Sequence, residues 1–303
     1  NGIAYLKLLF DASGVEQDLF MYLPLFASAL IQSGTESRDF VEITQEIGIQ
    51  TGGLHAGYGC GGVWGDRNAV RSNLALTSKV LHDKIPALFD LLVDILHTPD
   101  FANHPRLEEL SRIGRSRLRS SIVPHGNGYV NYRLDAYRSS LGLYNEYSRG
   151  ISQYHFIETL IEEIAQHPTE VEGKLRVLLS RIMSAGNLHL HITGSEEDLK
   201  AILTQMPRLL QILPTGRSQA ASLSFAPLTP GEGLIVPSQI QYVGKGINLY
   251  DHGFTYDGSF EVLKRVLSRD YLWNTVRVQG NAYGCFASLD AISGQFACIS
   301  YRD

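Results

Sequence analysis

A strand–helix–strand pattern occurs twice in this chain, and this repetition constrains the fold more than any other feature of the sequence. In each copy a strand is followed by a turn, a long helix, a glycine-containing turn and a strand rich in small residues. The last strand is preceded by residues 51–54 (TGGL) in the first copy and by residues 279–282 (QGNA) in the second. Repetition of this kind is typical of related structural units. We therefore expect an α+β protein with two related domains.

A segment rich in Pro, Ser, Thr, Gly and Ala, residues 214–233, separates the two copies and is the predicted linker. We expect a first domain over residues 1–213 and a second over 234–303. A length of 303 residues also favours two hydrophobic cores over one. Both ends of the sequence fall within strand patterns and there is no initiator Met. We therefore expect a fragment whose second domain is truncated.

The hydrophobic spacing predicts helices and strands along most of the chain. Pro24 lies inside a helical stripe and is expected to kink that helix or to delay its start. The predicted strands are 3–10, a small-residue strand from 54, and 70–80, 187–193, 234–243, 246–250, 282–289 and 295–301. The predicted helices are 16–33, 38–48, 84–97, 104–122, 196–210 and 259–274, with two or three more within 128–183.

The composition limits the classes of function. The formal net charge is −5, which argues against nucleic acid as a partner, because binding phosphate requires an excess of basic residues. The longest apolar run, residues 22–31, is about half of what a membrane span needs. Three cysteines are too few and too scattered for a disulfide framework or a zinc knuckle, and a reducing compartment fits best.

Searches for known catalytic motifs return nothing. The sequence has no H-x-x-E-H, no helical H-x-x-x-H, no G-x-S-x-G, no P-loop and no dinucleotide fingerprint. His189 and His191 share one face of a strand, but a catalytic zinc needs three protein ligands, and a half-exposed strand explains the pair better. Cys60 lies in a glycine-rich segment that we expect to be a flexible loop, and no His is placed to activate it.

Two clusters of one residue type have both a functional and a structural interpretation. Five arginines fall on the helix 104–122, either as a basic binding face or as a solvated surface balanced by nearby glutamates, and the second is favoured. A Tyr-rich segment follows, either lining a peptide groove or packing between helices. The arginines are Arg106, Arg112, Arg115, Arg117 and Arg119, and the tyrosines are Tyr129, Tyr132, Tyr137, Tyr144 and Tyr147.

Arg277 and Tyr283 flank the turn between the last helix and the strand after it. A guanidinium and a phenol aimed at one carbonyl oxygen can stabilise the charge that develops on it. By residue type alone a structural interpretation is favoured, in which Arg277 caps the helix C-terminus and Tyr283 packs in the core.

Several blocks of the sequence resemble the presequence protease branch of the pitrilysin/insulinase family of zinc metallopeptidases. The resemblance is carried mainly by residues 235–246 (IVPSQIQYVGKG), 267–273 (LSRDYLW) and 276–284 (VRVQGNAYG), with support from 1–6, 22–26 and 45–53. It implies four related α+β sandwich domains of the mitochondrial-processing-peptidase-like metallohydrolase type, in two halves that close around a chamber. This chain resembles the third domain and the front part of the fourth.

The resemblance also implies a division of labour. The zinc and its H-x-x-E-H motif belong to the absent N-terminal half, so no metal ligand is expected in this fragment, which alone should be inactive. Arg277 would anchor a substrate carbonyl, and Tyr283 would help to hold the oxyanion. Asn281 departs from the family pattern, in which Gly is common, but Asn tolerates a left-handed backbone. The alternative is an inactive scaffold or peptide-presenting subunit of the same fold.

The expected partners are peptide substrates and the N-terminal half of the same polypeptide, with no nucleic acid and no membrane. For a bacterial protein the expected location is the cytoplasm. The alternative, implied by the organellar members of the family, is the mitochondrial or plastid matrix.

Overall fold

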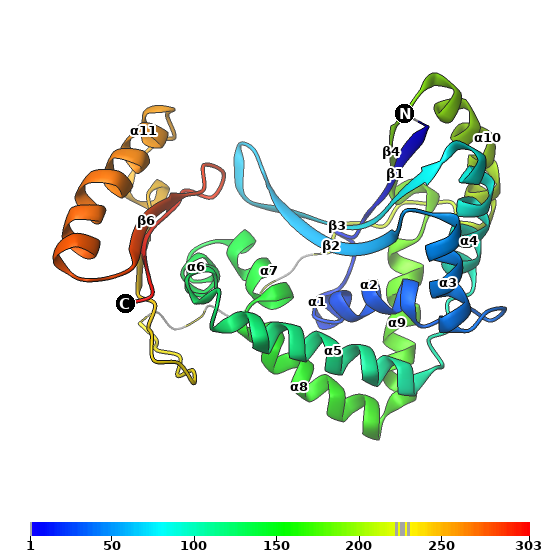
Figure 1. Cartoon of the computed structure of the whole chain (residues 1–303), viewed down its shortest axis with the longest axis horizontal. Helices are drawn as coiled ribbons and strands as arrows, with labels where there is room; N and C mark the ends of the chain where they lie inside the picture. The colour runs from blue at the N-terminus through cyan, green and yellow to red at the C-terminus, as the bar shows by residue number, and fades with distance from the viewer. Residues whose placement is uncertain (1, 222–223, 225–227, 229–230) are drawn as a thin grey trace. The chain divides into compact units, whose positions relative to one another are not determined.

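The computed structural model describes residues 2–221, 224, 228 and 231–303. The chain divides into two compact units, each assembled from three segments. Unit 1 comprises Asn1–Gly59, Ser72–Gly114 and Ile157–Leu223, and unit 2 comprises Cys60–Arg71, Arg115–Phe156 and Ser224–Asp303. Figure 1 shows the elements of both.

Unit 1 is built on a four-stranded sheet with the order β2-β3-β1-β4. The strands are β1 (Ile3–Asp11), β2 (Leu54–Val63), β3 (Asp66–Leu81) and β4 (Leu188–Thr193), and β1 pairs antiparallel with both β3 and β4. Along β1 the side chains of Leu6, Leu8 and Phe10 are buried, whereas Tyr5 and Lys7 are exposed. This alternation gives the sheet one face in the core and one open face.

Helices cover the buried face of that sheet in Figure 1. They are α1 (Gln17–Phe20), α2 (Leu23–Gln32), α3 (Phe40–Gln50), α4 (Ile85–His97), α9 (Pro168–Ile182) and α10 (Glu196–Ile212). Several of these helices begin where the sequence supplies a start signal. Asp39 caps α3 and Ser195 caps α10, in both cases with a reciprocal bond from the third helical residue. Pro24 falls in the first turn of α2, so the helix starts later, as predicted.

Unit 2 contains a three-stranded antiparallel sheet with the order β5-β7-β6. Its strands are β5 (Gly244–Asn248), β6 (Gly284–Leu289) and β7 (Gln295–Tyr301). In both sheets the last strand of the motif lies between the first and the second, as β3 lies between β1 and β2 and β7 lies between β5 and β6. This shared topology confirms the predicted internal repeat and the α+β class.

Two short helices of unit 2, α6 (Gly126–Ala136) and α7 (Ser140–Arg149), pack on each other, and α6 also packs on β5 and β7. Glycine permits the close approach of α6 to its neighbours. A Cβ atom on Gly126 would lie 2.2 Å from the Tyr242 ring, and one on Gly244 would lie 2.4 Å from Val130. Helices α5 (His104–Ile122) and α8 (Ile151–Gln166) each contribute residues to both units.

The helix before β6 begins as α11 (Ser259–Val266) and continues in π geometry as η4 (Leu267–Tyr271) and η5 (Trp273–Gln279). The sequence predicted one helix over 259–274 but not its wider turns, since π-helical segments have no simple periodic signature. Such segments are rare and occur frequently at functional sites. The remaining short 3₁₀ turns are η1 (His82–Lys84), η2 (Ala185–Asn187) and η3 (Tyr250–His252).

Other predicted elements need correction. The strand predicted over 234–243 is wrong, because these residues form neither helix nor strand and β5 begins at Gly244. The segment around Cys60 is not a loop but part of β2, since its glycines adopt extended backbone within the sheet. Four helices, α6 to α9, occupy the region for which two or three were predicted.

The compact units differ from the predicted division into domains 1–213 and 234–303. The tip of the β2–β3 hairpin and residues 115–156 cluster with the C-terminal segment. Part of the predicted linker 214–233, namely residues 222–223, 225–227 and 229–230, lies outside the described residues. The boundaries remain a prediction about evolutionary domains rather than compact units.

Candidate functional site

Arg277 and Tyr283 lie next to each other in unit 2, on η5 and just before β6. The Arg277 guanidinium donates a hydrogen bond to the main-chain carbonyl oxygen of Tyr283. Its central carbon lies 5.3 Å from the centroid of the Tyr283 ring. The structure therefore brings together the two residues on which the sequence-based hypothesis rests.

The turn between them places both side chains. Asn281 adopts a left-handed backbone with φ 62°, as predicted for this position. Its amide donates to the Arg277 carbonyl oxygen at 3.1 Å, and the Ala282 amide donates to the Val276 carbonyl oxygen at 3.2 Å. These two bonds close the end of η5 and turn the chain toward β6. The Arg277 side chain does not cap the helix, since its bond goes forward to Tyr283.

Trp273 is a third member of the site that the sequence reasoning missed. Its ring lies 4.3 Å from the Arg277 guanidinium carbon, at the distance of a cation–π contact. Residues 273 and 277 are one helical turn apart, and this spacing is the signal that could have identified the contact. Two aromatic rings and one carbonyl thus restrict the orientation of the guanidinium.

Tyr283 is not a core residue, because 62% of it is exposed. Its ring contacts Tyr301 at a centroid distance of 5.8 Å, and its amide donates to the Arg302 carbonyl oxygen at 3.3 Å. Its hydroxyl makes no hydrogen bond to any of the residues that the structure describes. A guanidinium has five N–H donors, so Arg277 keeps donors beyond the one bound to Tyr283. The pair can therefore present a cation and a phenolic O–H to an external acceptor.

The histidine and cysteine candidates do not form a catalytic centre. His189 and His191 are both exposed on β4, opposite Leu9 and Lys7 of β1. Within the described ranges, no three His, Cys, Asp or Glu side chains lie close enough together to hold a metal ion. Burial raises the pKa of the Cys60 thiol to about 11, so the thiol stays protonated at neutral pH.

The basic helix α5 has the favoured, structural interpretation for two of its arginines. Arg112 pairs with Glu108, and Arg106 pairs with Glu109 and lies over the Phe40 ring. These contacts use the charges within the protein. None of the helices in the described part of the chain is both long and apolar enough to cross a membrane.

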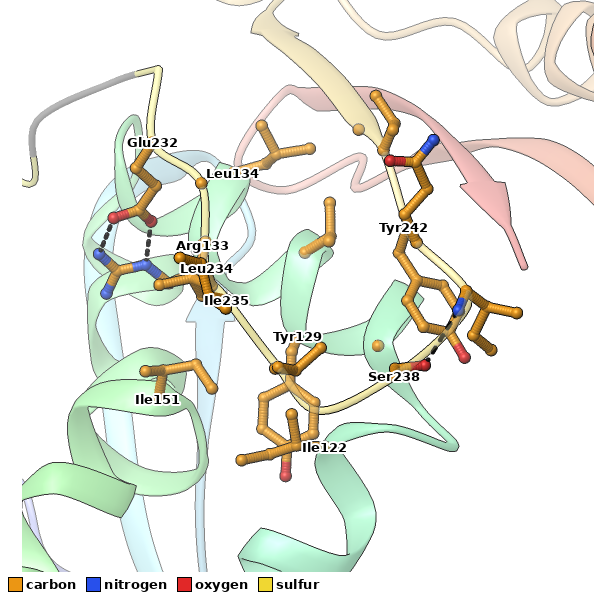
Figure 2. Close-up of a pocket in the computed structure, with 18 of the residues that line it drawn as sticks. Ile122, Tyr129, Arg133, Leu134, Ile151, Glu232, Leu234, Ile235, Ser238 and Tyr242 are labelled. Atoms are coloured by element: carbon orange, nitrogen blue, oxygen red, sulfur yellow. Dashed lines mark hydrogen bonds and ion pairs between the residues drawn. The ribbon is translucent and has the colours of Figure 1, made fainter. Parts of the chain in front are cut away.

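Tyr129 and Tyr137 of the Tyr-rich segment line a pocket of about 560 Å³ in unit 2 (Figure 2). The other residues that line it come mainly from α6 and from residues 231–244. Tyr132 packs edge-on against Tyr129 and does not line the pocket. The segment thus combines the two interpretations that the sequence left open, since it packs between helices and also borders a cavity.

Comparison with known families gives two matches along the chain. Residues 1–160 match the model of the family of peptidase M16 subfamily C associated domains, and residues 231–303 match the PreP C-terminal domain. The second match contains both Arg277 and Tyr283.

Curated relatives match over the whole chain. The chain is 28% identical to Presequence protease 1, chloroplastic/mitochondrial, from Arabidopsis thaliana and 28% identical to Protein HypA from Clostridium perfringens. It is 31% identical to the mitochondrial presequence protease of Saccharomyces cerevisiae. All of this chain is covered in each case, but it spans only 28%, 31% and 32% of the lengths of these relatives.

Solved structures share the fold at low sequence identity. A peptidase M16 inactive domain from Pseudomonas fluorescens superposes with a TM-score of 0.57 at 17% identity, over 99% of this chain and 69% of that one. Pitrilysin superposes with a TM-score of 0.53 at 13% identity, over 100% of this chain and 32% of that one. These similarities support the sandwich architecture of the metallohydrolase type.

Proposed function

The chain belongs to the family of peptidase M16 subfamily C associated domains, and from this premise we propose that it is the metal-free part of a zinc-dependent endopeptidase that degrades short unfolded peptides. In this proposal the chain supplies contacts to the substrate and part of the wall of a closed chamber. The observation that carries the proposal is the Arg277–Tyr283 pair, in which a cation and a phenol lie side by side on an exposed surface.

The proposed roles follow from the chemistry of the two groups. Peptide hydrolysis places negative charge on the carbonyl oxygen, and pre-positioned donors stabilise that charge more than they stabilise the substrate. Arg277 binds a substrate carbonyl oxygen, and the Tyr283 hydroxyl donates to the oxygen that gains charge. Trp273 and the Tyr283 carbonyl orient the guanidinium before substrate arrives. A zinc ion held outside this chain would activate the attacking water.

Substitutions in the full-length protein test these roles. Tyr283→Phe removes only the hydroxyl, and Arg277→Ala removes the cation. We expect each to lower kcat for a fluorogenic peptide by about 10²-fold, the effect of losing one oxyanion donor, with an unchanged midpoint of urea unfolding. Tyr271→Phe, at an equally exposed tyrosine that contacts neither residue, is the control. Unchanged kcat in both variants would remove the pair from the active site.

The isolated chain tests the division of labour. We expect it to show no zinc-dependent cleavage of the same peptide alone, and activity to appear when the remaining part of the polypeptide is added in trans. Robust cleavage by the chain alone would contradict the proposal.

A scaffold function is the second candidate, because a structural neighbour is described as an inactive domain. The exposed Tyr283 hydroxyl favours the enzyme, since a scaffold has no use for a solvent-facing donor beside a cation. An H-x-x-E-H motif in the rest of the polypeptide supports the enzyme, and its absence supports the scaffold. The relatives named as mitochondrial, chloroplastic and bacterial are compatible with either an organelle matrix or a bacterial cytoplasm as the location.

A further inference from the structure

The pocket in Figure 2 lies between one face of α6 and a segment without helix or strand, residues 231–243, which we call the strap. The α6 side is a complete helical face, because its lining positions recur every three or four residues. They are Gly126, Tyr129, Val130, Arg133, Leu134 and the following Tyr137. The volume of about 560 Å³ is within the range of ligand pockets.

Both ends of the strap are fixed. At one end, Glu232 accepts two hydrogen bonds from the Arg133 guanidinium, at 2.5 and 2.8 Å. At the other, the Tyr242 hydroxyl donates to the Val123 carbonyl oxygen at 2.6 Å, and Gln241 exchanges main-chain bonds with Asp303. The strap is therefore held beside the pocket by contacts that do not involve its middle.

The middle of the strap has unused main-chain hydrogen-bonding groups. The amides of residues 233–236 donate to no described residue. The Ile235 side chain is fully exposed, so that it does not fill the pocket from this side. Main-chain N–H groups without partners beside an apolar cavity are the arrangement on which an extended peptide adds by strand pairing.

The polar groups of the pocket narrow the ligand further. Arg133 is neutralised by Glu232 and by the fully buried Glu146, so it is not available as a free cation for an anionic ligand. The Tyr137 hydroxyl is buried near Glu232 and Arg133 but forms no hydrogen bond of normal geometry with a described residue. It is available to donate to a neutral acceptor such as a carbonyl oxygen. Much of the remaining lining is apolar, including Ile122, Val130, Leu134 and Ile151.

We propose that this pocket binds a branched aliphatic or aromatic side chain of an extended peptide, whose main chain pairs with strap residues 233–236 and accepts a hydrogen bond from Tyr137. The proposal deepens the proposed function, because the peptide would be a substrate held at a second place away from the Arg277–Tyr283 pair. The binding itself does not depend on cleavage.

Binding is measured with the ¹⁵N-labelled chain and the capped peptide Lys-Thr-Ser-Thr-Leu-Thr-Ser-Thr-Lys. We expect saturable shifts of the amide signals of Gly233 and Ile235. Replacing the central Leu of the peptide by Asn, or methylating the two main-chain nitrogens beside it, should abolish saturation. Equal binding of either modified peptide, or no saturable shift with the Leu peptide, would overturn the proposal.

Variants of the chain separate the two kinds of contact. Ile235→Pro removes one strap N–H and should abolish binding, whereas Ile235→Ala keeps that N–H and should bind as the parent chain does. Tyr137→Phe removes only the hydroxyl and should weaken binding about threefold to tenfold, the effect of one hydrogen bond. Unchanged affinity in both Ile235→Pro and Tyr137→Phe contradicts the assignment of the site.

The same measurements distinguish this inference from the proposed function. No zinc and no turnover are involved, so a failure to bind leaves the proposed roles of Arg277 and Tyr283 unaffected. Conversely, binding that persists in Tyr283→Phe, while the full-length variant loses kcat, shows two separate sites.

Discussion

The Arg277 guanidinium donates a hydrogen bond to the Tyr283 carbonyl oxygen while the rings of Trp273 and Tyr283 lie 4.3 and 5.3 Å from its central carbon. A long, flexible side chain is thus held in a restricted orientation without a carboxylate partner among the described residues. An ion pair would neutralise the charge, whereas ring and carbonyl contacts orient it and leave it available.

Trp273→Leu should reduce catalysis because it frees Arg277 to sample other rotamers. An exposed cation–π contact contributes about 0.5–1 kcal/mol, so we expect kcat/KM of the full-length protein to fall about twofold to fivefold. Steady-state assays with a fluorogenic peptide give the value. Val278→Leu, at an exposed position of the same helix without contact to Arg277, serves as the control. A Trp273→Leu enzyme with unaltered kinetics would show that stacking does not position the guanidinium.

Asn281→Val should destabilise the turn that brings Arg277 and Tyr283 together. Residue 281 has φ 62°, where a β-branched side chain clashes with its own backbone at a cost of about 1–2 kcal/mol. Asn281→Gly removes the clash and should leave the free energy of unfolding within about 0.5 kcal/mol of the parent. Urea unfolding of the chain checks both. Equal stability of the Val and Gly variants would mean that the turn adopts another conformation.

Much of the fold was predictable because its helices and strands have strong local signals. The alternation in β1, the amphipathic α4 and the capped starts of α3 and α10 depend only on neighbours in sequence. The repeat also predicted two sheets of the same topology. The strand wrongly predicted over 234–243 shows the limit, since its apolar alternation is real but its residues border a pocket instead of pairing in a sheet.

The candidate site was only partly predictable. The motif placed Arg277 and Tyr283 six positions apart, and the left-handed Asn281 was expected. The stacking of Trp273, the π geometry of η5 and the bond to the Tyr283 carbonyl depend on how the helix end meets β6, which no local pattern encodes. The strap and its pocket depend on contacts such as Arg133–Glu232, which joins residues 99 positions apart.

Arg133→Met should destabilise unit 2 strongly. Glu146 is fully buried and pairs with Arg133 at 2.9 Å, so removal of the cation leaves a buried carboxylate uncompensated, at a cost of about 3–5 kcal/mol. The double variant Arg133→Met with Glu146→Leu removes both charges and should recover most of that loss. Unfolding midpoints of the parent, both single variants and the double variant complete the cycle. A double variant no more stable than Arg133→Met would show that the pair is not the dominant contact.

The thiols should be unreactive in the folded chain. Burial raises the pKa of Cys60 to about 11 and also raises the pKa of Cys285 and Cys298. Since the thiolate is the reactive species, Ellman's reagent at about pH 8 should modify all three slowly, and rapidly only after addition of guanidinium chloride. Fast stoichiometric labelling of Cys60 in native buffer would contradict its placement in β2.

Asp135 should make the stability of the chain depend on pH near neutrality. Burial, and then the charge of Asp290, raise the pKa of the Asp135 carboxyl from 3.8 to about 7. Because the folded state binds a proton more tightly than the unfolded state does, the stabilising protonated form is fully present below about pH 4. Stability from this group is lost as the pH rises from about 4 to about 7 and stays constant above that.

Asp135→Asn removes this titration and tests it directly. The amide oxygen can still accept the hydrogen bond that Asn131 donates to the carboxylate at 2.8 Å. We expect the variant to resemble the parent at about pH 4 and to exceed it by about 2–3 kcal/mol in unfolding free energy at about pH 8, as a shift of this direction and size requires. Asp251→Asn, at an exposed carboxylate of the same unit, should show no such growth with pH. If the gap between Asp135→Asn and the parent is the same at both pH values, the carboxyl is not buried beside Asp290, and the packing of α6 against the β6–β7 turn must differ from that described.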